Sequence, residues 1–523
     1  MSKRDLLWII CMVCFISINS YAQEEFPHYS KGRTHVDTSQ VSATKWKALK
    51  RDVPAWFNDA KFGIYAHWGP YCVPIYTTHY TGSGNSWYSR WIYTKGHPYN
   101  INQINKYGPL QSFGYKDFFQ MFSAPRFNAN EWAEIVAASG AKFAGPVAMH
   151  HDGFAMWDSD VAPWNAADYG PKRDICGELI EAYRGKGLKV VSSFHHGYTF
   201  SGLYYGRSKN IEPNTDIYDP KYAKLYGNFK DQRDAEAYWL ALLKEYIVKY
   251  KPDQLWFDWG QRWISWETRY QLAKFYYETL ERAGMKGIIS MKANQWPIEV
   301  SLRDFERGGA KQIESRPWQT DDSPGPWMCK EQMVFKGADW IKTLLVDVVS
   351  KNGTLLLNIT PHPLGYILED QASSLREVGQ WLNINGEAIY GSRPWKVYYQ
   401  GPNSRFTLKI KKGQHLPKGV EVYANSGHTY YIKLQSNDFR FTRSKDGGSL
   451  YVFAMNRPSD FAIASLHSKD LKRHSTISLL GSDKRVSVEF NKEKQAYVKL
   501  DTFSKEMEKL SAPYVFKIEG LKR

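Results

Sequence analysis

One short apolar run decides the fold of this chain: Gln254-Leu255-Trp256-Phe257-Asp258-Trp259-Gly260. The run is apolar on both faces, which is typical of a strand in a parallel sheet, and it follows a helical pattern from Asp234 to Tyr250 that ends at Lys251-Pro252. Asp258 therefore falls at the C-terminal end of a predicted strand, where barrel enzymes carry their catalytic groups. An isolated aspartate at such a position more often caps the next helix or anchors a loop. The rest of the chain has to decide between these interpretations.

Strand-like runs alternate with amphipathic segments between Lys61 and Pro361. The strand-like runs are Phe62–Trp68, Phe143–Met149, Leu188–Phe194, Leu255–Trp259, Gly287–Met291 and Thr354–Ile359. The helical segments are Asn130–Ser139, Ile175–Arg184, Asp234–Tyr250, Glu267–Ala283 and Ala338–Ser350. This α/β alternation predicts parallel strands joined by crossover helices and closed into a (β/α)8-like TIM barrel. A doubly wound open sheet is the alternative, but no glycine-rich phosphate-binding loop follows the first strand.

The sequence pattern changes near Trp395. Short runs now alternate apolar and polar residues and are separated by Gly, Asn, Asp and Lys turns; they are Phe406–Ile410, Val420–Tyr423, Tyr430–Leu434, Leu450–Phe453 and Val486–Phe490. They predict a C-terminal antiparallel β-sandwich, joined to the barrel by a helix and turn over Arg376–Tyr390. We therefore divide the chain into a signal peptide (1–22), a catalytic barrel (23–392) and a sandwich (393–523).

The first residues have the pattern of a secretory signal. Lys3 and Arg4 precede an apolar run from Leu6 to Ile18, and small residues before Gln23 form a cleavage site. This pattern predicts an exported protein, periplasmic or secreted. No later apolar stretch is long enough to span a membrane.

Composition narrows the partners and cofactors. The 523 residues are 15% aromatic, with 20 Trp and 35 Tyr, and aromatic rings with polar edges are common platforms for sugars. The net charge of +16 suits an anionic polysaccharide, although a generally basic surface is the simpler explanation. Export and the lack of a Lys/Arg block argue against nucleic acid. Outside the signal, Cys72, Cys176 and Cys329 form neither a disulfide framework nor a metal-binding spacing, so we expect no metal and no cofactor.

Histidines recur where the predicted strands end. The first run ends in His67-Trp68-Gly69, the second in His150-His151-Asp152, the third in His195-His196-Gly197 and the fourth in Asp258. Because a barrel brings these ends together and a buried imidazole needs hydrogen-bond partners, the pattern predicts one shared polar pocket. A metal site is the competing explanation. We expect none, because adjacent histidines point to opposite faces of an extended strand and no acidic residues complete a familiar spacing.

Four motifs in this order resemble those of the α-L-fucosidases of glycoside hydrolase family 29. Lys61–Gly69 resembles the first-strand motif of the family, His150–Ser159 its histidine-pair motif, Trp256–Asp258 its nucleophile strand and Val348–Ile359 its last barrel segment. The resemblance extends from about Lys45 to Tyr390, and the family also carries a sandwich after the barrel.

The resemblance implies a retaining exo-α-L-fucosidase that acts on glycans or polysaccharide fragments. In that mechanism one carboxylate attacks the anomeric carbon while an acid about 5 to 5.5 Å away protonates the leaving oxygen. Asp258 matches the nucleophile. The expected substrate-binding residues supply imidazoles for hydroxyl groups, aromatic rings for the apolar sugar face and one cation; they are His67, Trp87, His150, His151, His195, Trp256 and Lys292.

The acid/base is less plainly marked. One branch of the family places it in a Trp-Glu pair, but the matching position here is Gln319, which cannot protonate a leaving group. Glu299, Glu306 and Glu314 are near in sequence; we favour Glu306, with Glu314 in reserve. A glutamate acting as an acid near neutrality needs a raised pKa, which we expect burial and the negative nucleophile to supply. The alternative is that Glu306 only pairs with a neighbouring arginine.

Two departures from the family concern the sugar pocket. Many relatives have Glu-Trp-Tyr where this chain has Ser86-Trp87-Tyr88, and relatives often have an arginine where it has Lys292. The same scaffold could therefore serve an α-L-galactosidase or an exo-glycosidase for sulfated polysaccharides, such as those of algae. A catalytically inactive carbohydrate-binding protein is the further alternative. Linkage preference and oligomeric state do not follow from the sequence.

Overall fold

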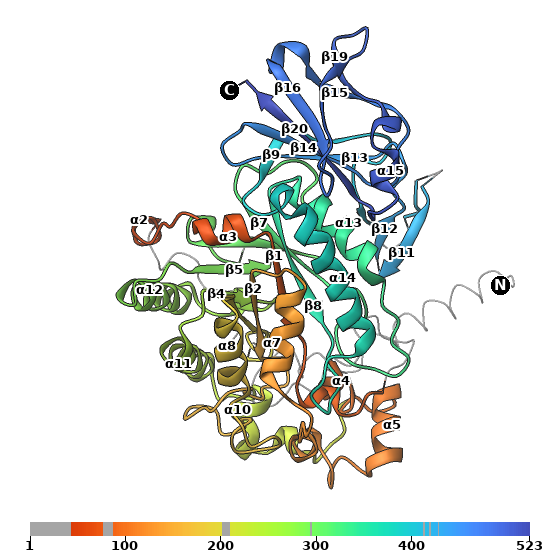
Figure 1. The fold of residues 1–523 in the computed structure, drawn as a ribbon. Coiled ribbons are helices and arrows are strands. Elements are labelled where there is room, and N and C mark those ends of the chain that lie inside the picture. Colours follow the sequence, from red (N-terminus) through yellow and green to blue (C-terminus); the bar gives the residue numbers. More distant parts are fainter. Residues whose placement is uncertain are drawn as a thin grey trace, which may run out of the picture.

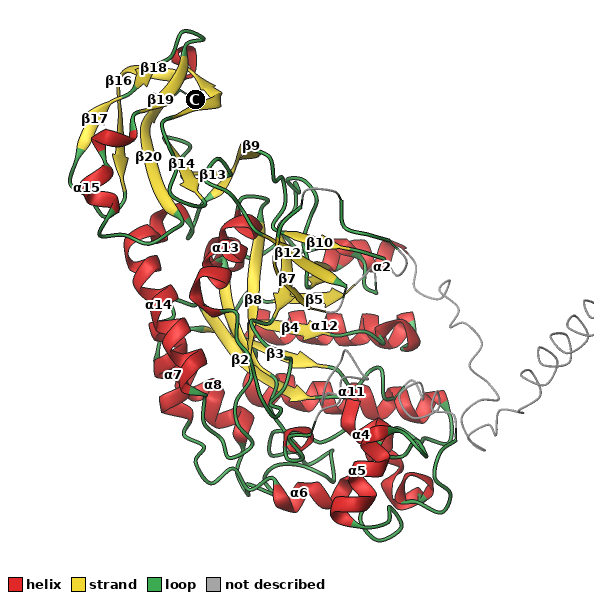
Figure 2. Ribbon diagram, turned by 90° about the vertical axis from the view of Figure 1, so that its right-hand side faces the viewer, coloured by secondary structure: helices red, strands yellow, loops and turns green. Residues whose placement is uncertain are grey.

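The structure is a computed structural model that describes residues 43–76, 87–200, 210–292, 295–411, 414–417, 420–426 and 428–522. The predicted signal peptide (1–22) and Ser86 lie outside the described residues. Figures 1 and 2 show a barrel wrapped by helices and, at one end of the molecule, a group of sheets formed by the C-terminal part of the chain.

Eight parallel strands close into a barrel, as the sequence predicts. They are β1 (Phe62–Ala66), β2 (Phe143–Met149), β3 (Lys189–Phe194), β4 (Gln254–Phe257), β5 (Ile288–Lys292), β6 (Ser301–Glu306), β7 (Trp318–Asp322) and β8 (Gly353–Ile359). Each strand pairs with the next along the chain, and β8 returns to pair with β1, with Leu355 opposite Phe62. The C-terminal ends of the strands therefore meet at one mouth of the barrel.

Two strands, β6 and β7, are not predicted by the apolar pattern. Their inward-facing residues are polar: Gln319 in β7 donates to Asp304 in β6 at 2.6 Å and accepts from Gln254 in β4 at 2.8 Å. All three side chains are buried inside the barrel. A search for apolar runs misses strands whose interior residues are satisfied by one another's hydrogen bonds.

Helices cover the outside of the barrel (Figure 1). The predicted segments form α7 (Ala129–Ala138), α8 (Ile175–Gly185), α11 (Gln232–Tyr250), α12 (Trp266–Arg282) and α13 (Gly337–Val349), and shorter helices include α2 (Ala43–Ala48), α3 (Ala55–Ala60), α4 (Tyr88–Trp91), α5 (Pro98–Tyr107), α6 (Phe118–Met121), α10 (Ala223–Tyr226) and α15 (Ser504–Met507). Helix α11 begins where the Asp231 side chain accepts from the Asp234 N–H and ends at Lys251 in a left-handed conformation before Pro252. The linking helix is α14 (Glu369–Asn385), which begins earlier than predicted.

The C-terminal strands form antiparallel sheets. They are β9 (Arg393–Gln400), β10 (Thr407–Lys409), β11 (Val422–Ser426), β12 (Thr429–Ile432), β13 (Phe439–Arg443), β14 (Ser449–Ala454), β15 (Phe461–His467), β16 (Leu471–Leu479), β17 (Arg485–Ser487), β18 (Glu489–Phe490), β19 (Gln495–Val498) and β20 (Tyr514–Leu521). A six-stranded sheet, β17-β16-β20-β14-β13-β9, and a three-stranded sheet, β15-β19-β18, share a core that contains Phe441, Ile463 and Phe516. These two sheets form the predicted sandwich.

The third sheet, β10-β12-β11, differs from the prediction because it packs on the barrel. Phe406 and Tyr431 belong to the same apolar cluster as the barrel and its helices, not to the core of the sandwich. The sandwich itself is fixed to α13 by a buried ion pair in which Arg440 Nε lies 2.7 Å from Asp347 Oδ1, and Lys351 lies 2.7 Å from the other oxygen. The apolar contact of the third sheet and the ion pair of the sandwich are therefore both buried.

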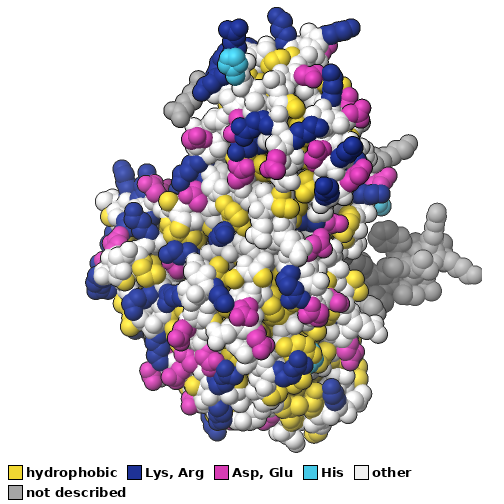
Figure 3. Space-filling view, in the orientation of Figure 1, with side chains coloured by type: hydrophobic (Ala, Val, Ile, Leu, Met, Phe, Trp, Pro, Cys, Tyr) yellow, Lys and Arg dark blue, Asp and Glu magenta, His cyan; other side chains and the backbone are white. Residues whose placement is uncertain are grey.

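Among the described residues, no helix is both long and apolar enough to cross a membrane. On the face shown in Figure 3, Lys and Arg side chains are spread over both structural parts and interspersed with Asp and Glu. On this face the excess positive charge is distributed rather than concentrated.

Candidate active site

Asp258 lies at the mouth of the barrel, directly after β4, and four groups hold it there. Its backbone N–H donates to the Phe194 carbonyl at 3.1 Å. One carboxylate oxygen accepts from His195 Nδ1 at 3.0 Å and lies 3.4 Å from His151 Nε2, and the other lies 3.1 Å from Lys292 Nζ. Burial raises the pKa of Asp258, but Lys292 and the two imidazoles outweigh it, so the pKa is held well below its usual range. Asp258 is therefore a buried, ionised carboxylate.

Lys292, at the end of β5, joins the carboxyl groups of the site. Its buried ammonium lies 3.1 Å from Asp258, 3.1 Å from Glu306 Oε2 and 3.2 Å from Asp321 Oδ2. Since the same nitrogen contacts Asp258 and Glu306, the two contacting oxygens are no more than twice 3.1 Å apart. That limit includes the roughly 5–5.5 Å that separates the two carboxyl groups of retaining glycosidases.

Glu306 ends β6 on the solvent side of this group, with 34% of its side chain exposed. Trp259 Nε1 donates to its carboxylate at 3.3 Å. Burial and the negative Asp258 raise the pKa of Glu306, as expected, but Lys292 lowers it more, so the net shift is downward. The expectation of a raised pKa is therefore wrong for this arrangement, because the sequence did not show that a lysine stands between the two carboxyl groups.

The other two glutamates lie at the opposite end of the barrel. The backbone of Glu314 is hydrogen-bonded to Lys351 and Asn352, which precede β8, and its side chain is exposed. Glu299 is exposed in the short helix that precedes β6. The structure brings neither to Asp258, so Glu314 is no longer a reserve for the acid/base.

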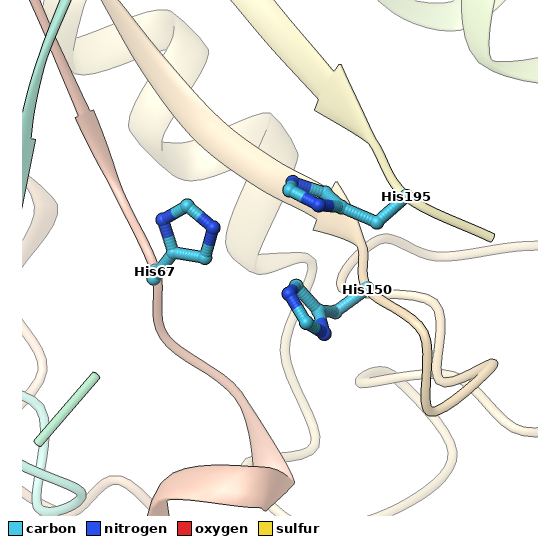
Figure 4. Close-up of side chains that lie close together, drawn as sticks. All are labelled: His67, His150 and His195. Carbon is cyan, nitrogen blue, oxygen red and sulfur yellow. The ribbon is translucent and has the colours of Figure 1, made fainter. Parts of the chain in front are cut away.

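The predicted histidine pocket is present. Figure 4 shows His67, His150 and His195 turned toward one shared space from the ends of β1, β2 and β3. His67 Nδ1 pairs with the amide oxygen of Asn358 at 2.8 Å, and the rings of His150 and His195 have centroids 4.4 Å apart. Burial lowers the pKa of all three imidazoles. Neutral imidazoles can both donate and accept hydrogen bonds, which suits sugar hydroxyl groups.

The same imidazoles could hold a metal ion. Single nitrogen atoms of His67, His150 and His195 lie within 4.8 Å of one another, and His151, His195 and Asp258 form a second such group. The expectation that adjacent histidines face apart is wrong for His150 and His151, because both follow the end of β2 and their ring centroids are 4.6 Å apart. Four imidazole nitrogens of these groups are already hydrogen-bonded: His67 Nδ1 to Asn358, His195 Nδ1 to Asp258, His195 Nε2 to Ser193 and His151 Nδ1 to the His195 carbonyl.

The two predicted aromatic residues lie at different depths. Trp256 is fully buried under Lys292, whose ammonium is 4.9 Å from the ring centroid, and its Nε1 donates to Asp304 at 3.0 Å. Trp87 lies at the rim, with its ring centroid 5.5 Å from that of His151. All the expected substrate-binding residues therefore lie in or beside one site.

The family model for alpha-L-fucosidase matches residues 30–387. The chain belongs to this family. The plasma alpha-L-fucosidase of Rattus norvegicus is 32% identical over 379 residues, covering 67% of this chain and 73% of that protein, and the tissue alpha-L-fucosidase of Homo sapiens is 31% identical over 400 residues, covering 72% and 77%. The structure of Thermotoga maritima alpha-fucosidase in complex with fucose matches with a TM-score of 0.68 at 23% identity, over 91% of this chain and 99% of that one. The resemblance found in the sequence is thus confirmed, and the chain is a glycoside hydrolase with α-L-fucosidase relatives.

Two acidic residues of this fucosidase-family site were not predicted from the sequence. Asp304 and Asp321 lie in β6 and β7; burial and the adjacent Asp321 raise the pKa of Asp304 well above its usual range, while Asp321 accepts from Tyr65 at 3.0 Å and contacts Lys292. Their signal was the spacing of two residues, Asp304 to Glu306 and Gln319 to Asp321, which places each pair on one face of a strand.

The barrel-packed sheet reaches the turn that carries Glu306. Tyr431 donates to both carboxylate oxygens of Asp322, at 2.8 and 2.9 Å, and Thr429 donates to the Arg307 carbonyl at 3.2 Å. Lys409 donates to the Glu306 carbonyl. Three residues of the C-terminal part of the family member thus contact residues beside the site, which no local sequence pattern indicated.

Proposed function

We propose that the protein is a retaining exo-α-L-fucosidase in which Asp258 is the nucleophile and Glu306 the acid/base. One observation carries the proposal: a single buried ammonium, that of Lys292, lies 3.1 Å from each of these carboxyl groups. Their spacing therefore suits a double displacement, in which no water needs to fit between the nucleophile and the sugar.

In the first step an oxygen of Asp258 attacks the anomeric carbon, and the bond to the leaving oxygen breaks as Glu306 gives that oxygen its proton. Lys292 and His195 keep Asp258 ionised for the attack. In the second step Glu306 takes a proton from water, which attacks the same carbon and releases Asp258. The sugar leaves with its original anomeric configuration.

The histidine pocket supports a terminal fucosyl unit as the bound sugar. His67 and His150 offer ring nitrogens to hydroxyl groups, whereas both ring nitrogens of His195 are hydrogen-bonded, to Ser193 and to Asp258. The ring of Trp256 lies next to that of His195, with the centroids 5.2 Å apart. We also propose that the enzyme is exported, on the secretory pattern of residues 1–22, and acts on glycans or polysaccharide fragments outside the cytoplasm.

The contacts of Lys292 weaken one argument for a sulfated substrate, namely that this lysine binds the sulfate. The ammonium of Lys292 already contacts three carboxyl groups, so its charge is not available to an incoming sulfate. An L-galactosyl unit shares the ring configuration of fucose and adds one hydroxyl, so the assay has to distinguish between the two sugars.

The test compares hydrolysis of an aryl α-L-fucoside and an aryl α-L-galactoside by the wild type and by Asp258→Gly. We expect the fucoside to be preferred and the variant to lose at least about 10⁴-fold in kcat. Undiminished activity of Asp258→Gly would remove the nucleophile assignment. Preference for the galactoside would replace the substrate, and saturable sugar binding without turnover by the wild type would favour a binding protein.

A further inference from the structure

The two tryptophans that flank Asp258 face different surroundings. Trp256 is fully buried in the barrel, whereas Trp259 is 46% exposed and is one of the large apolar side chains that the described part of the chain leaves open to solvent. Within the described part of the chain its indole makes one polar contact, the hydrogen bond from Nε1 to Glu306 at 3.3 Å. An exposed indole at the mouth of the barrel, beside the proposed acid/base, is not explained by packing.

The turn that carries Trp259 is fixed rather than loose. Gly260 has φ of 110°, and a Cβ atom there would lie 2.4 Å from the backbone nitrogen of Tyr198, so only glycine fits. The N–H groups of Gly260 and Arg262 both donate to the buried Gln295 side chain at 3.1 Å. The backbone that carries the indole is therefore fixed, and the indole itself contacts Glu306 through its N–H.

The position of Glu306 indicates which part of the substrate lies next to this indole. If Glu306 protonates the leaving oxygen, that oxygen must come within hydrogen-bond reach of its carboxylate, and the leaving group then extends toward solvent on the same side. The fucosyl unit occupies the histidine pocket on the other side of Asp258. The ring attached to the leaving oxygen thus passes over Trp259.

Resting on the proposed function, we infer that Trp259 is a platform for the leaving group, on which the neutral sugar ring next to the terminal fucosyl unit stacks. A sugar ring has an apolar face of C–H groups that covers an indole well, and stacking tolerates different sugars and linkages. The site would thus bind a saccharide on the leaving side without demanding one glycan.

The experiment compares two donors in the full-length enzyme. The first, α-L-fucosyl fluoride, has no ring on the leaving side; the second is an α-L-fucosyl-galactose disaccharide. For each of wild type, Trp259→Ala and Trp259→Phe, the ratio of kcat/KM for the disaccharide to that for the fluoride is measured. Phe490→Ala, which removes an exposed aromatic ring in the sandwich, is the matched control.

We expect the ratio to fall about tenfold in Trp259→Ala, to change less than about threefold in Trp259→Phe, which keeps a ring but lacks the N–H, and to stay constant in Phe490→Ala. Equal losses on both donors in Trp259→Ala would overturn the inference, because Trp259 would then make no contact specific to the ring on the leaving side. A loss in Trp259→Phe as large as in Trp259→Ala would also overturn it, because Trp259 would then act only through its hydrogen bond to Glu306. A wild type that hydrolyses neither donor would overturn the proposed function itself.

Discussion

Replacement of Lys292 by methionine tests how the site sets its own protonation. The side chain length is kept, but the cation that contacts Asp258 and Glu306 at 3.1 Å is lost. At that distance and an effective dielectric constant near 20, each pair of unit charges interacts by about 5 kcal/mol. Water entering the space and the remaining His195 contact offset part of this, so we expect both pKa values to rise by about 1 to 3 units.

The direction in which the pH profile moves depends on the protonation state that each carboxyl group needs for catalysis. Burial raises the pKa of both carboxyl groups, and Lys292 now lowers both, so its removal raises both. The acid limb of the kcat/KM profile requires ionised Asp258 and moves to higher pH. The alkaline limb requires protonated Glu306 and also moves to higher pH. The whole bell-shaped profile therefore shifts upward in pH.

The assay is a pH profile of kcat/KM with a fucosyl disaccharide, whose poor leaving group needs the acid. Lys292→Arg keeps the charge and is the control, with both limbs expected within about half a unit of the wild type. If Lys292→Met lowers kcat/KM but leaves both limbs at their wild-type pH, Lys292 does not set these pKa values and has only a structural role.

Three further results are expected. In Glu306→Ala we expect kcat to fall about 10²- to 10⁴-fold on the disaccharide and less on an aryl fucoside, and to recover partly when azide is added. Glu314→Ala should keep its activity. If instead Glu314→Ala loses activity and Glu306→Ala keeps it, Glu314 is the acid/base. In the wild type the lowered pKa of Glu306 should place the alkaline limb of the kcat/KM profile for the disaccharide below pH 7, and at a lower pH than for an activated aryl fucoside. Alkaline limbs at the same pH for both substrates would show that Glu306 does not set this limb. Arg440→Met leaves the buried Asp347 with one cation and should lower the free energy of unfolding, measured with denaturant, by about 3 to 5 kcal/mol. Lys433→Met, which breaks an exposed ion pair, should lower it by less than about 1 kcal/mol. Equal losses in the two variants would show that the Arg440–Asp347 pair contributes little to stability.

Much of the fold could be predicted because most barrel strands are apolar on both faces. The run that ends at Asp258 is the clearest case, since a buried parallel strand needs no polar alternation. Strands β6 and β7 could not be found in this way, because their buried residues satisfy one another across the barrel. The sheet β10-β12-β11 looked like part of the sandwich, since its alternation does not say which apolar surface it covers.

The grouping of the site's histidines could be predicted from the arrangement of the barrel strands. Barrel topology alone brings the strand ends together, so His67, His150 and His195 could be placed in one pocket without knowing a distance. The pKa of Glu306 could not be predicted in this way, because it depends on the 3.1 Å contact with Lys292. Nor could Glu314 be excluded, because its place at the far end of the barrel depends on where β7 begins.

The central claim is that Asp258 forms a covalent bond to the sugar. Incubation with a 2-fluoro-fucosyl fluoride, which slows the second step more than the first, followed by proteolysis and mass spectrometry, tests it most directly. We expect one fluorofucosyl unit on the peptide that contains Asp258, formed at the same rate as activity is lost. A label on another residue, or an enzyme that hydrolyses fucosides and is never labelled, would contradict it.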